Sequence, residues 1–177
     1  MPFHDQYVEV MLTAEQIQEK VADLGKQITQ DYQGKELTLV GIMKGSIFFF
    51  TDLARHIDLP ITLELMGVSS YQGGTETTGE VRITTDLTKP MNGRHVIVVE
   101  DIVDTGLTMQ FLLENLKARH PASLKVATLL EKPSRAKVKV PIDYKGFTIE
   151  DRFVVGYGLD YGEKYRNLPF VGVMRTD

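Results

Sequence analysis

The sequence predicts an α/β fold: a mostly parallel, twisted sheet flanked by helices, with a small C-terminal hood. Three observations predict it. Strand-like apolar runs alternate with segments of helical periodicity through the middle of the chain, which is typical of helices on both faces of one sheet. One run, residues 96–99, is entirely aliphatic, as expected for a strand buried on both faces. Finally, the 177 residues are 42% hydrophobic, enough for a sizeable core.

The first expected element is an amphipathic helix. Thr13 and Gln16 have the spacing of a capping box. The apolar residues that follow recur on one helical face: Ile17, Val21, Leu24 and Ile28. An apolar run at residues 37–42 then predicts a strand, residues 43–46 a tight loop, and residues 47–50 the start of a second helix.

The next expected strand spans residues 61–66, whose side chains show the alternation of a half-buried strand. Residues 69–80 include three glycines and almost nothing apolar, which predicts a long loop. Strands resume at residues 81–86 and, after a turn at Asn92-Gly93, at residues 96–99.

Helical periodicity returns beyond residues 102–108, a predicted loop, and residues 124–130 form another apolar run. From residue 138 onward the apolar runs are short and broken by Gly and Pro. We therefore expect a single domain over residues 1–177. Its core covers about residues 11–137, and its hood about residues 1–10 and 138–177.

Composition excludes several classes of protein. The 20 Lys and Arg against 24 Asp and Glu give a net charge of -4, so no overall field attracts nucleic acid or an anionic membrane. The chain has no cysteine and its four histidines lie far apart, which argues against a disulfide framework or structural zinc. No apolar run approaches the roughly 18 to 20 residues that span a bilayer. We expect a cytoplasmic protein with neither nucleic-acid nor membrane partners.

The most informative segment follows the aliphatic strand at residues 96–99. Glu100 and Asp101 come first, and the loop Asp-Thr-Gly-Leu-Thr at residues 104–108 leads into a predicted helix. In open α/β sheets, ligands bind beyond the carboxyl ends of the strands, where helix N-termini offer free N–H groups to phosphates. A Thr-Gly-x-Thr loop adds hydroxyl donors and allows close approach of the backbone.

The two carboxylates would repel a phosphate at close range. Glu100 and Asp101 are therefore expected to face hydroxyl groups or a divalent cation. A ligand with a phosphate at one end and a vicinal diol at the other meets both demands. That describes a phosphorylated ribose.

This block resembles the phosphoribosyl pyrophosphate signature of the type I phosphoribosyltransferases. Four further stretches resemble bacterial hypoxanthine phosphoribosyltransferases: residues 39–46, 69–71, 130–133 and 153–161. The resemblance as a whole extends from about residue 8 to residue 174. It implies an enzyme of purine salvage. Such an enzyme transfers the 5-phosphoribosyl group to hypoxanthine, and also to guanine, which yields IMP or GMP and pyrophosphate.

The resemblance also implies roles for the acidic block. Glu100 and Asp101 would hold the ribose hydroxyls and Mg²⁺, and Asp160 would bind a second Mg²⁺ through water. Asp104 would accept a proton from the purine imidazole ring as the opposite nitrogen attacks C1 of the ribose, as a general base does. The residues that would wrap the 5'-phosphate are Asp104, Thr105, Gly106, Leu107 and Thr108.

The same resemblance assigns the pyrophosphate to Lys44 and Gly45, in a loop where the peptide bond before the lysine is often cis. Arg166 would add a second cation. Ser70 and Tyr71 would lie at the root of a closing lid formed by residues 69–80, which would exclude water during transfer.

The resemblance also implies three contacts with the purine base. Lys132 would donate a hydrogen bond to the 6-oxo oxygen, Phe153 would stack on the ring, and the backbone of Val154 would contact the ring edge. A lysine donates hydrogen bonds and cannot accept them, so Lys132 would select a 6-oxopurine over adenine. We interpret three nearby cations as a solvated basic patch: Arg135, Lys137 and Lys139.

Two alternatives stay open at this stage. One is a regulator with the same fold that binds nucleotide and RNA or DNA; Asp104, Lys132, the lid and the negative net charge favour the enzyme instead. The other is a phosphoribosyltransferase for another base such as xanthine, orotate or uracil, of which orotate would require a further cationic contact. The resemblance also implies a homodimer or homotetramer.

Overall fold

The main element of the computed structural model, which describes residues 2, 6–70 and 80–175, is a six-stranded sheet in the order β4-β3-β2-β5-β6-β7. All neighbouring strands are parallel except β3 and β4, which confirms the predicted sheet. Its strands are β2 (Leu37–Met43), β3 (Thr62–Ser70), β4 (Val81–Thr85), β5 (His95–Val103), β6 (Ser123–Glu131) and β7 (Tyr144–Thr148).

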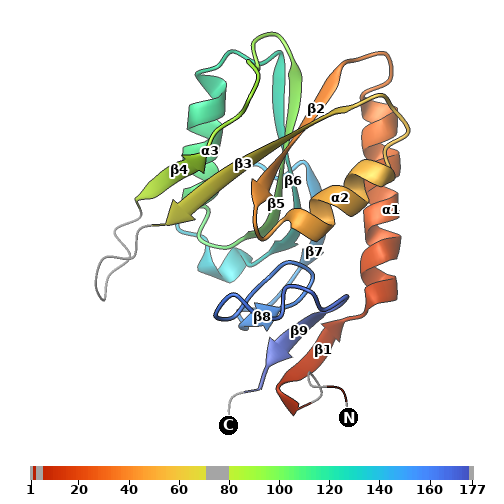
Figure 1. The fold of residues 1–177 in the computed structure, drawn as a ribbon, viewed down its shortest axis with the longest axis vertical. Coiled ribbons are helices and arrows are strands. Elements are labelled where there is room, and N and C mark those ends of the chain that lie inside the picture. The colour runs from red at the N-terminus through yellow and green to blue at the C-terminus, as the bar shows by residue number, and fades with distance from the viewer. Residues whose placement is uncertain (1, 3–5, 71–79, 176–177) are drawn as a thin grey trace.

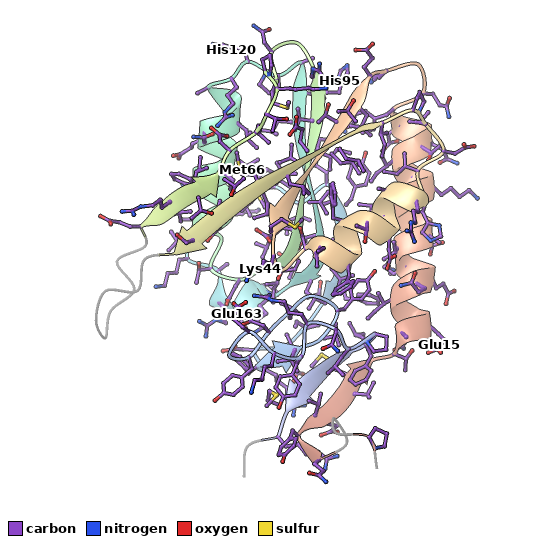
Figure 2. All side chains as sticks on the ribbon, in the orientation of Figure 1. Glu15, Lys44, Met66, His95, His120 and Glu163 are labelled. Carbon is purple, nitrogen blue, oxygen red and sulfur yellow. The ribbon has the colours of Figure 1, made fainter. Side chains whose placement is uncertain are left out.

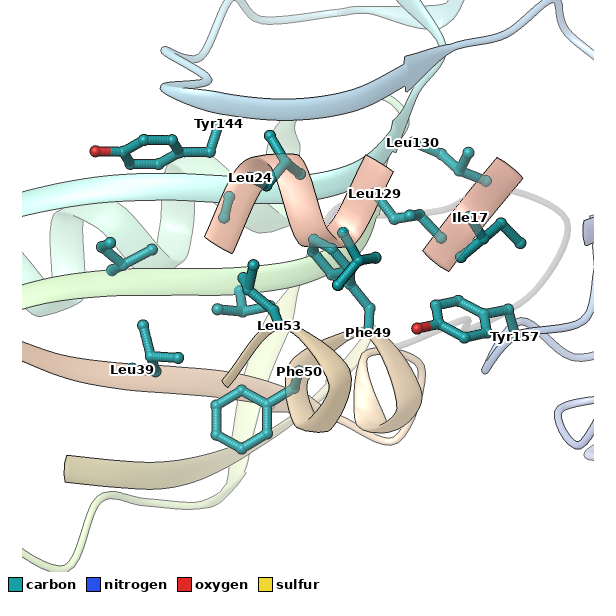
Figure 3. Packing of buried hydrophobic residues seen from close by; sticks show 14 of the residues in the cluster. Ile17, Leu24, Leu39, Phe49, Phe50, Leu53, Leu129, Leu130, Tyr144 and Tyr157 are labelled. Atoms are coloured by element: carbon teal, nitrogen blue, oxygen red, sulfur yellow. The ribbon is translucent and has the colours of Figure 1, made fainter. Parts of the chain in front are cut away.

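Helices cover both faces of this sheet, as predicted. Helices α1 (Ala14–Asp31) and α2 (Ile47–Arg55) lie on one side, and α3 (Leu107–Lys117) lies on the other (Figure 1). Figure 3 shows the core on the first side, where Ile17 of α1 and Phe49 of α2 pack near Leu129 of β6. None of the helices in the described part of the chain is long and apolar enough to cross a membrane.

The start of α1 agrees with its sequence pattern. The Thr13 amide donates to Gln16 Oε1 at 2.9 Å, and the Gln16 amide donates to Thr13 Oγ1 at 3.1 Å. This reciprocal pair satisfies two amides that have no partner within the helix. The four predicted apolar positions of the helix are all buried: Ile17, Val21, Leu24 and Ile28.

Strand β3 is half-buried, but its buried face is not the more apolar one. Leu63 and Leu65 are 51% and 48% exposed, whereas Glu64 and Met66 are buried. Met66 joins the core beneath α3, and Glu64 accepts from Thr88 Oγ1 at 2.9 Å. Helix α2 packs mainly on β2 and β5, and this leaves the outer face of β3 uncovered.

The expected hood boundary at residue 138 falls before a strand of the main sheet and needs correction. Strand β7 pairs in parallel with β6, and its first residue, Tyr144, is buried and donates a hydrogen bond to Asp31 Oδ2 of α1 at 2.6 Å. A second sheet in the order β1-β9-β8 forms the hood. Its strands are β1 (Val8–Leu12), β8 (Val154–Val155) and β9 (Val171–Met174). Figure 1 shows it beyond the carboxyl ends of β2 and β5. The assignment of the whole chain to one domain stays a prediction.

Candidate active site

Two carboxylates lie near the carboxyl end of β5 without a cationic partner. Glu100 is buried, and no ion pair joins it or Asp101 to a cation among the described residues. Burial raises the pKa of Glu100 well above its ordinary value, and the charge of Asp101 adds to the rise. Burial also raises the pKa of Asp101, although hydrogen bonding with Glu100 and the Ile102 amide, and to a smaller extent the charge of Arg166, opposes that shift. Buried charge is costly unless it is paired, so this pair favours a cation or hydroxyl donors as its ligand.

The loop between β5 and α3 borders a cavity of about 230 Å³. Gly106 caps α3 with φ 85, and a Cβ there would lie 2.6 Å from the Val138 carbonyl oxygen, so the loop requires glycine. The lining comprises Glu100, Asp101, Ile102, Val103, Asp104, Thr105, Gly106, Thr108 and Met109. Every residue expected at the ribose and phosphate lines it except Leu107, the first residue of α3. The helix therefore begins beside a cavity that suits an anion.

A second cavity, of about 440 Å³, adjoins the first and shares Ile102 and Asp104 with it. Its lining comprises Ile102, Asp104, Lys132, Arg135, Asp151, Phe153, Val154, Leu159 and Asp160. The three residues expected at the purine and the acid expected at a second Mg²⁺ are thus brought together here.

A buried cation and an exposed aromatic ring both line this second cavity. Lys132 is 7% exposed, and its Nζ lies 3.8 Å from Asp151 Oδ1. Phe153 is 54% exposed and meets Tyr161 edge-on, with ring centroids 5.7 Å apart. Val154 is buried in β8. A free aromatic face and a fixed donor are suited to a planar heterocycle with a carbonyl group.

Arg135 is exposed, as expected, but it also pairs with two carboxylates of this cavity. Its Nε donates to Asp104 Oδ1 at 2.6 Å, and its Nη1 lies 3.5 Å from Asp151 Oδ2. The hydrogen bond that Arg135 donates to Asp104 raises the pKa of the guanidinium. Sequence reasoning missed the contact between Arg135 and Asp104, because only the fold brings these two side chains together. Asp151 was missed as well.

The loop after β2 packs against both sheets. The Met43–Lys44 peptide bond is cis, as the resemblance implied. A Cβ on Gly45 would overlap the Asp101 carboxylate, and a Cβ on Gly158 would overlap the Gly45 carbonyl oxygen. The backbone at Gly45 is therefore held between β5 and the hood.

Lys44 and Arg166, the two cations expected at the pyrophosphate, meet at one carboxylate. Lys44 Nζ donates to Glu163 Oε2 at 2.9 Å, and Arg166 Nη2 donates to Glu163 Oε1 at 3.1 Å. Figure 2 shows Lys44 and Glu163 side by side where the main sheet meets the hood. The hydrogen bond from Lys44 and the charge of Arg166 lower the pKa of Glu163. Arg166 also lies 3.4 Å from Asp160. Sequence reasoning missed Glu163.

Two expected features lie partly or wholly outside the described residues. Strand β3 ends at Ser70, whose side chain is not described, and Tyr71 and the lid segment at residues 71–79 are not described. The lid therefore stays a prediction. Among the residues that are described, no group of three or more His, Cys, Asp or Glu side chains could hold a metal ion. Glu100 and Asp101 line the first cavity, and Asp160 lines the second.

Comparison with known proteins gives one consistent result. A model of the phosphoribosyl transferase domain matches residues 11–162. A hypoxanthine-guanine phosphoribosyltransferase of Staphylococcus aureus (strain Mu50 / ATCC 700699) is 48% identical over 174 residues, which cover 98% of this chain and 97% of the relative. One of Streptococcus pneumoniae (strain ATCC BAA-255 / R6) is 50% identical over 169 residues, which cover 96% and 94%.

Solved structures agree with the sequence relatives. The crystal structure of a hypoxanthine phosphoribosyltransferase from Staphylococcus aureus superimposes with a TM-score of 0.94 at 48% identity and covers 99% of this chain and 95% of that one. A hypoxanthine-guanine phosphoribosyltransferase from Bacillus anthracis gives a TM-score of 0.89 at 46% identity and covers 93% and 97%. The chain therefore belongs to the phosphoribosyltransferase family, as its motifs predicted.

Proposed function

We propose that this protein transfers the 5-phosphoribosyl group of phosphoribosyl pyrophosphate to hypoxanthine or guanine, in purine salvage. The products are IMP or GMP and pyrophosphate. The relatives that carry this activity in their names match the chain over nearly its full length. The cytoplasmic location expected from the sequence stays a prediction.

One observation carries the proposal: Asp104 lines both cavities. The first cavity offers a helix N-terminus and unpaired carboxylates, which suit a ribose phosphate. The second offers Lys132 and Phe153, which suit an oxopurine. The bond between sugar and base must form where the two ligands meet, and Asp104 and Ile102 lie at that boundary.

In the proposed reaction, a bond forms between a purine imidazole nitrogen and C1 of the ribose. The C1–oxygen bond breaks, and pyrophosphate leaves with the bonding electron pair. The proton on the opposite imidazole nitrogen passes to Asp104. Arg135 Nε holds Asp104 Oδ1, which leaves the second carboxylate oxygen to accept the proton. Lys44 and Arg166 stabilise the charge on the leaving group.

We propose that Glu100 and Asp101 bind Mg²⁺ and the ribose hydroxyls, and that Asp160 binds a second Mg²⁺ through water. Carboxylate oxygens are the ligands that Mg²⁺ prefers, and the ion commonly binds one or two of them together with substrate phosphates. The uncompensated charge of Glu100 and Asp101 fits such an ion. When bound, it neutralises charge on the pyrophosphate.

Lys132 determines the choice of base in this proposal. Its position directly after β6 and its burial hold the ammonium in the second cavity. An ammonium matches a 6-oxo oxygen but leaves the 6-amino group of adenine opposite another donor. Hypoxanthine and guanine are therefore accepted and adenine is rejected.

The test is an ultraviolet absorbance assay with purified protein, Mg²⁺ and phosphoribosyl pyrophosphate, to which each base is added in turn. Nucleotide should form with hypoxanthine and guanine and be absent with adenine, orotate and uracil. Turnover of a pyrimidine alone, or no turnover with any base, would overturn the proposal.

The proposed homodimer or homotetramer would cover apolar surface. Leu63 and Leu65 on the outer face of β3 are the side chains that such a contact would bury. Light scattering on Leu63→Glu, compared with the unchanged chain, tests this; an unchanged molar mass would exclude β3 from the contact.

A further inference from the structure

The carboxylate of Glu163 engages the two cations that the proposed reaction needs for pyrophosphate. One oxygen accepts from Lys44 Nζ and the other from Arg166 Nη2, so each oxygen has its own cation. Lys44 follows β2 in the main sheet, whereas Glu163 and Arg166 lie in the hood. The carboxylate thus bridges the two parts of the site, as Figure 2 shows for Lys44 and Glu163.

Arg166 is only partly used in this arrangement. Its Nη1 donates to the Gly158 carbonyl oxygen at 2.6 Å, whereas its Nε is buried and has no hydrogen-bond partner among the described residues. A buried donor without an acceptor is costly. The guanidinium therefore has a donor that the Glu163 carboxylate does not satisfy.

The Glu163 side chain can leave without unfolding the loop. The Glu163 side chain is 64% exposed, and the Lys44 side chain is 70% exposed. The Glu163 amide donates to Asp160 Oδ2 at 2.9 Å, which fixes the backbone independently of the side chain. Rotation of the Glu163 side chain into solvent would free Lys44 and leave Arg166 with Asp160 and the Gly158 carbonyl oxygen, and it would move no strand.

We propose that Glu163 competes with pyrophosphate for Lys44 and Arg166, and so weakens the binding of the leaving group. The inference rests on the proposed function for the identity of the anion. Glu163 acts through Lys44 and Arg166 and is a positioning residue, not a catalytic one. In the empty site it keeps both cations near their working positions, and after transfer it displaces the pyrophosphate.

The size of the effect follows from the exposure of these contacts. Ion pairs between exposed side chains are weak, because water screens them. Removal of the competing charge should therefore tighten pyrophosphate binding by about three- to tenfold. If release of pyrophosphate limits turnover, the same change lowers kcat and KM for phosphoribosyl pyrophosphate together.

The test compares E163Q with the unchanged protein by calorimetric titration with inorganic pyrophosphate, with and without Mg²⁺. The matched control is Glu15→Gln, which removes the same charge from an exposed site at the start of α1, far from Lys44 in Figure 2. A double-mutant cycle with K44A separates the local effect from net charge. The E163Q substitution should increase the affinity for pyrophosphate less in the K44A variant than in the unchanged protein.

Tighter binding to E163Q alone, with a smaller gain in the K44A background, is the expected result. Equal or weaker binding to E163Q, or an equal gain with E15Q, would overturn the inference. The titration needs no turnover, so its outcome does not depend on whether the protein transfers a phosphoribosyl group. If the protein transferred no phosphoribosyl group but E163Q still bound pyrophosphate more tightly, only the function would fail.

Discussion

Gly45 and Asp101 lie in such close contact that a Cβ on Gly45 would overlap the Asp101 carboxylate. The first residue follows β2 and the second lies near the end of β5, and these two strands are neighbours in the sheet. On the other side of Gly45, its carbonyl oxygen leaves no room for a Cβ on Gly158. The proposed pyrophosphate loop and the proposed ribose-binding acid are therefore positioned by each other.

Gly45→Ala should lower kcat/KM by about 10²-fold, because a displacement of about 1 Å in a reacting geometry has that effect. The methyl group must move either Asp101 or the loop. Steady-state kinetics measures the change. Gly34→Ala is the control: Gly34 has φ +73 and open space around it, so the substitution costs about 1 kcal/mol in stability and leaves kcat/KM unchanged. Unchanged kinetics in Gly45→Ala would show that the contact is not needed.

Asp104→Asn should lower turnover by about 10² to 10⁴-fold, the range that general bases contribute. The amide oxygen can still accept from Arg135, so the side chain keeps its place while it loses its basicity. Phosphoribosyl pyrophosphate should bind nearly as before in a calorimetric titration. Unchanged turnover would remove Asp104 from this role.

Glu100→Gln should stabilise the protein free of metal and substrate, because it removes a buried charge next to Asp101. The amide oxygen can still accept from the Asp101 amide. A rise in the thermal midpoint of at least about 2 °C at neutral pH, the shift that about 1 kcal/mol produces in a chain of this size, is expected. Phosphoribosyl pyrophosphate should bind more weakly.

The effect of Glu100→Gln should depend on pH in a defined direction. The raised pKa means that the folded state retains the Glu100 proton to higher pH than the unfolded chain does. Stability is therefore lost as pH rises from the ordinary value of 4.5 through the raised pKa. The difference between variant and unchanged protein should be near zero below that ordinary value and grow above it. A difference that shrinks with rising pH would contradict the assignment.

Tyr157→Phe should destabilise the protein by about 1 to 3 kcal/mol. The Tyr157 hydroxyl is buried at the hood and donates to Asp52 of α2, and burial together with this bond raises the pKa of the phenol. Without the hydroxyl, the hydrogen bond that Asp52 keeps among the described residues is the one from Gln18 Nε2 at 3.0 Å. Urea unfolding measures the loss. Tyr161→Phe, at an exposed ring, should leave the free energy of unfolding unchanged.

Much of the fold could be predicted because its signals are local. The Thr13–Gln16 capping box and the aliphatic run in β5 depend on neighbours in the sequence, and both were correct. The buried face of β3 could not be found in this way. It depends on which helix covers which part of the sheet, and α2 leaves Leu63 and Leu65 uncovered.

In the candidate site, too, features set by neighbours in the sequence could be predicted, and features set by the fold could not. The acids and the Thr-Gly loop are contiguous in the sequence, so their joint cavity was predictable. Arg135, Asp151 and Glu163 act through partners that the fold brings to them, such as Lys44, which lies 119 residues from Glu163 in the sequence. Charge alone made Arg135 indistinguishable from the solvated lysines near it. Its partner Asp104 became apparent only in three dimensions.

The central claim is that two cavities joined at Asp104 hold the two halves of one nucleotide. A crystal structure of the protein soaked with IMP, pyrophosphate and Mg²⁺ tests this most directly. The 5'-phosphate should lie at the amides of residues 105–108, and the oxopurine should lie against Phe153 with its oxygen at Lys132. A nucleotide bound elsewhere, with Glu100 and Asp101 facing only solvent, would contradict it.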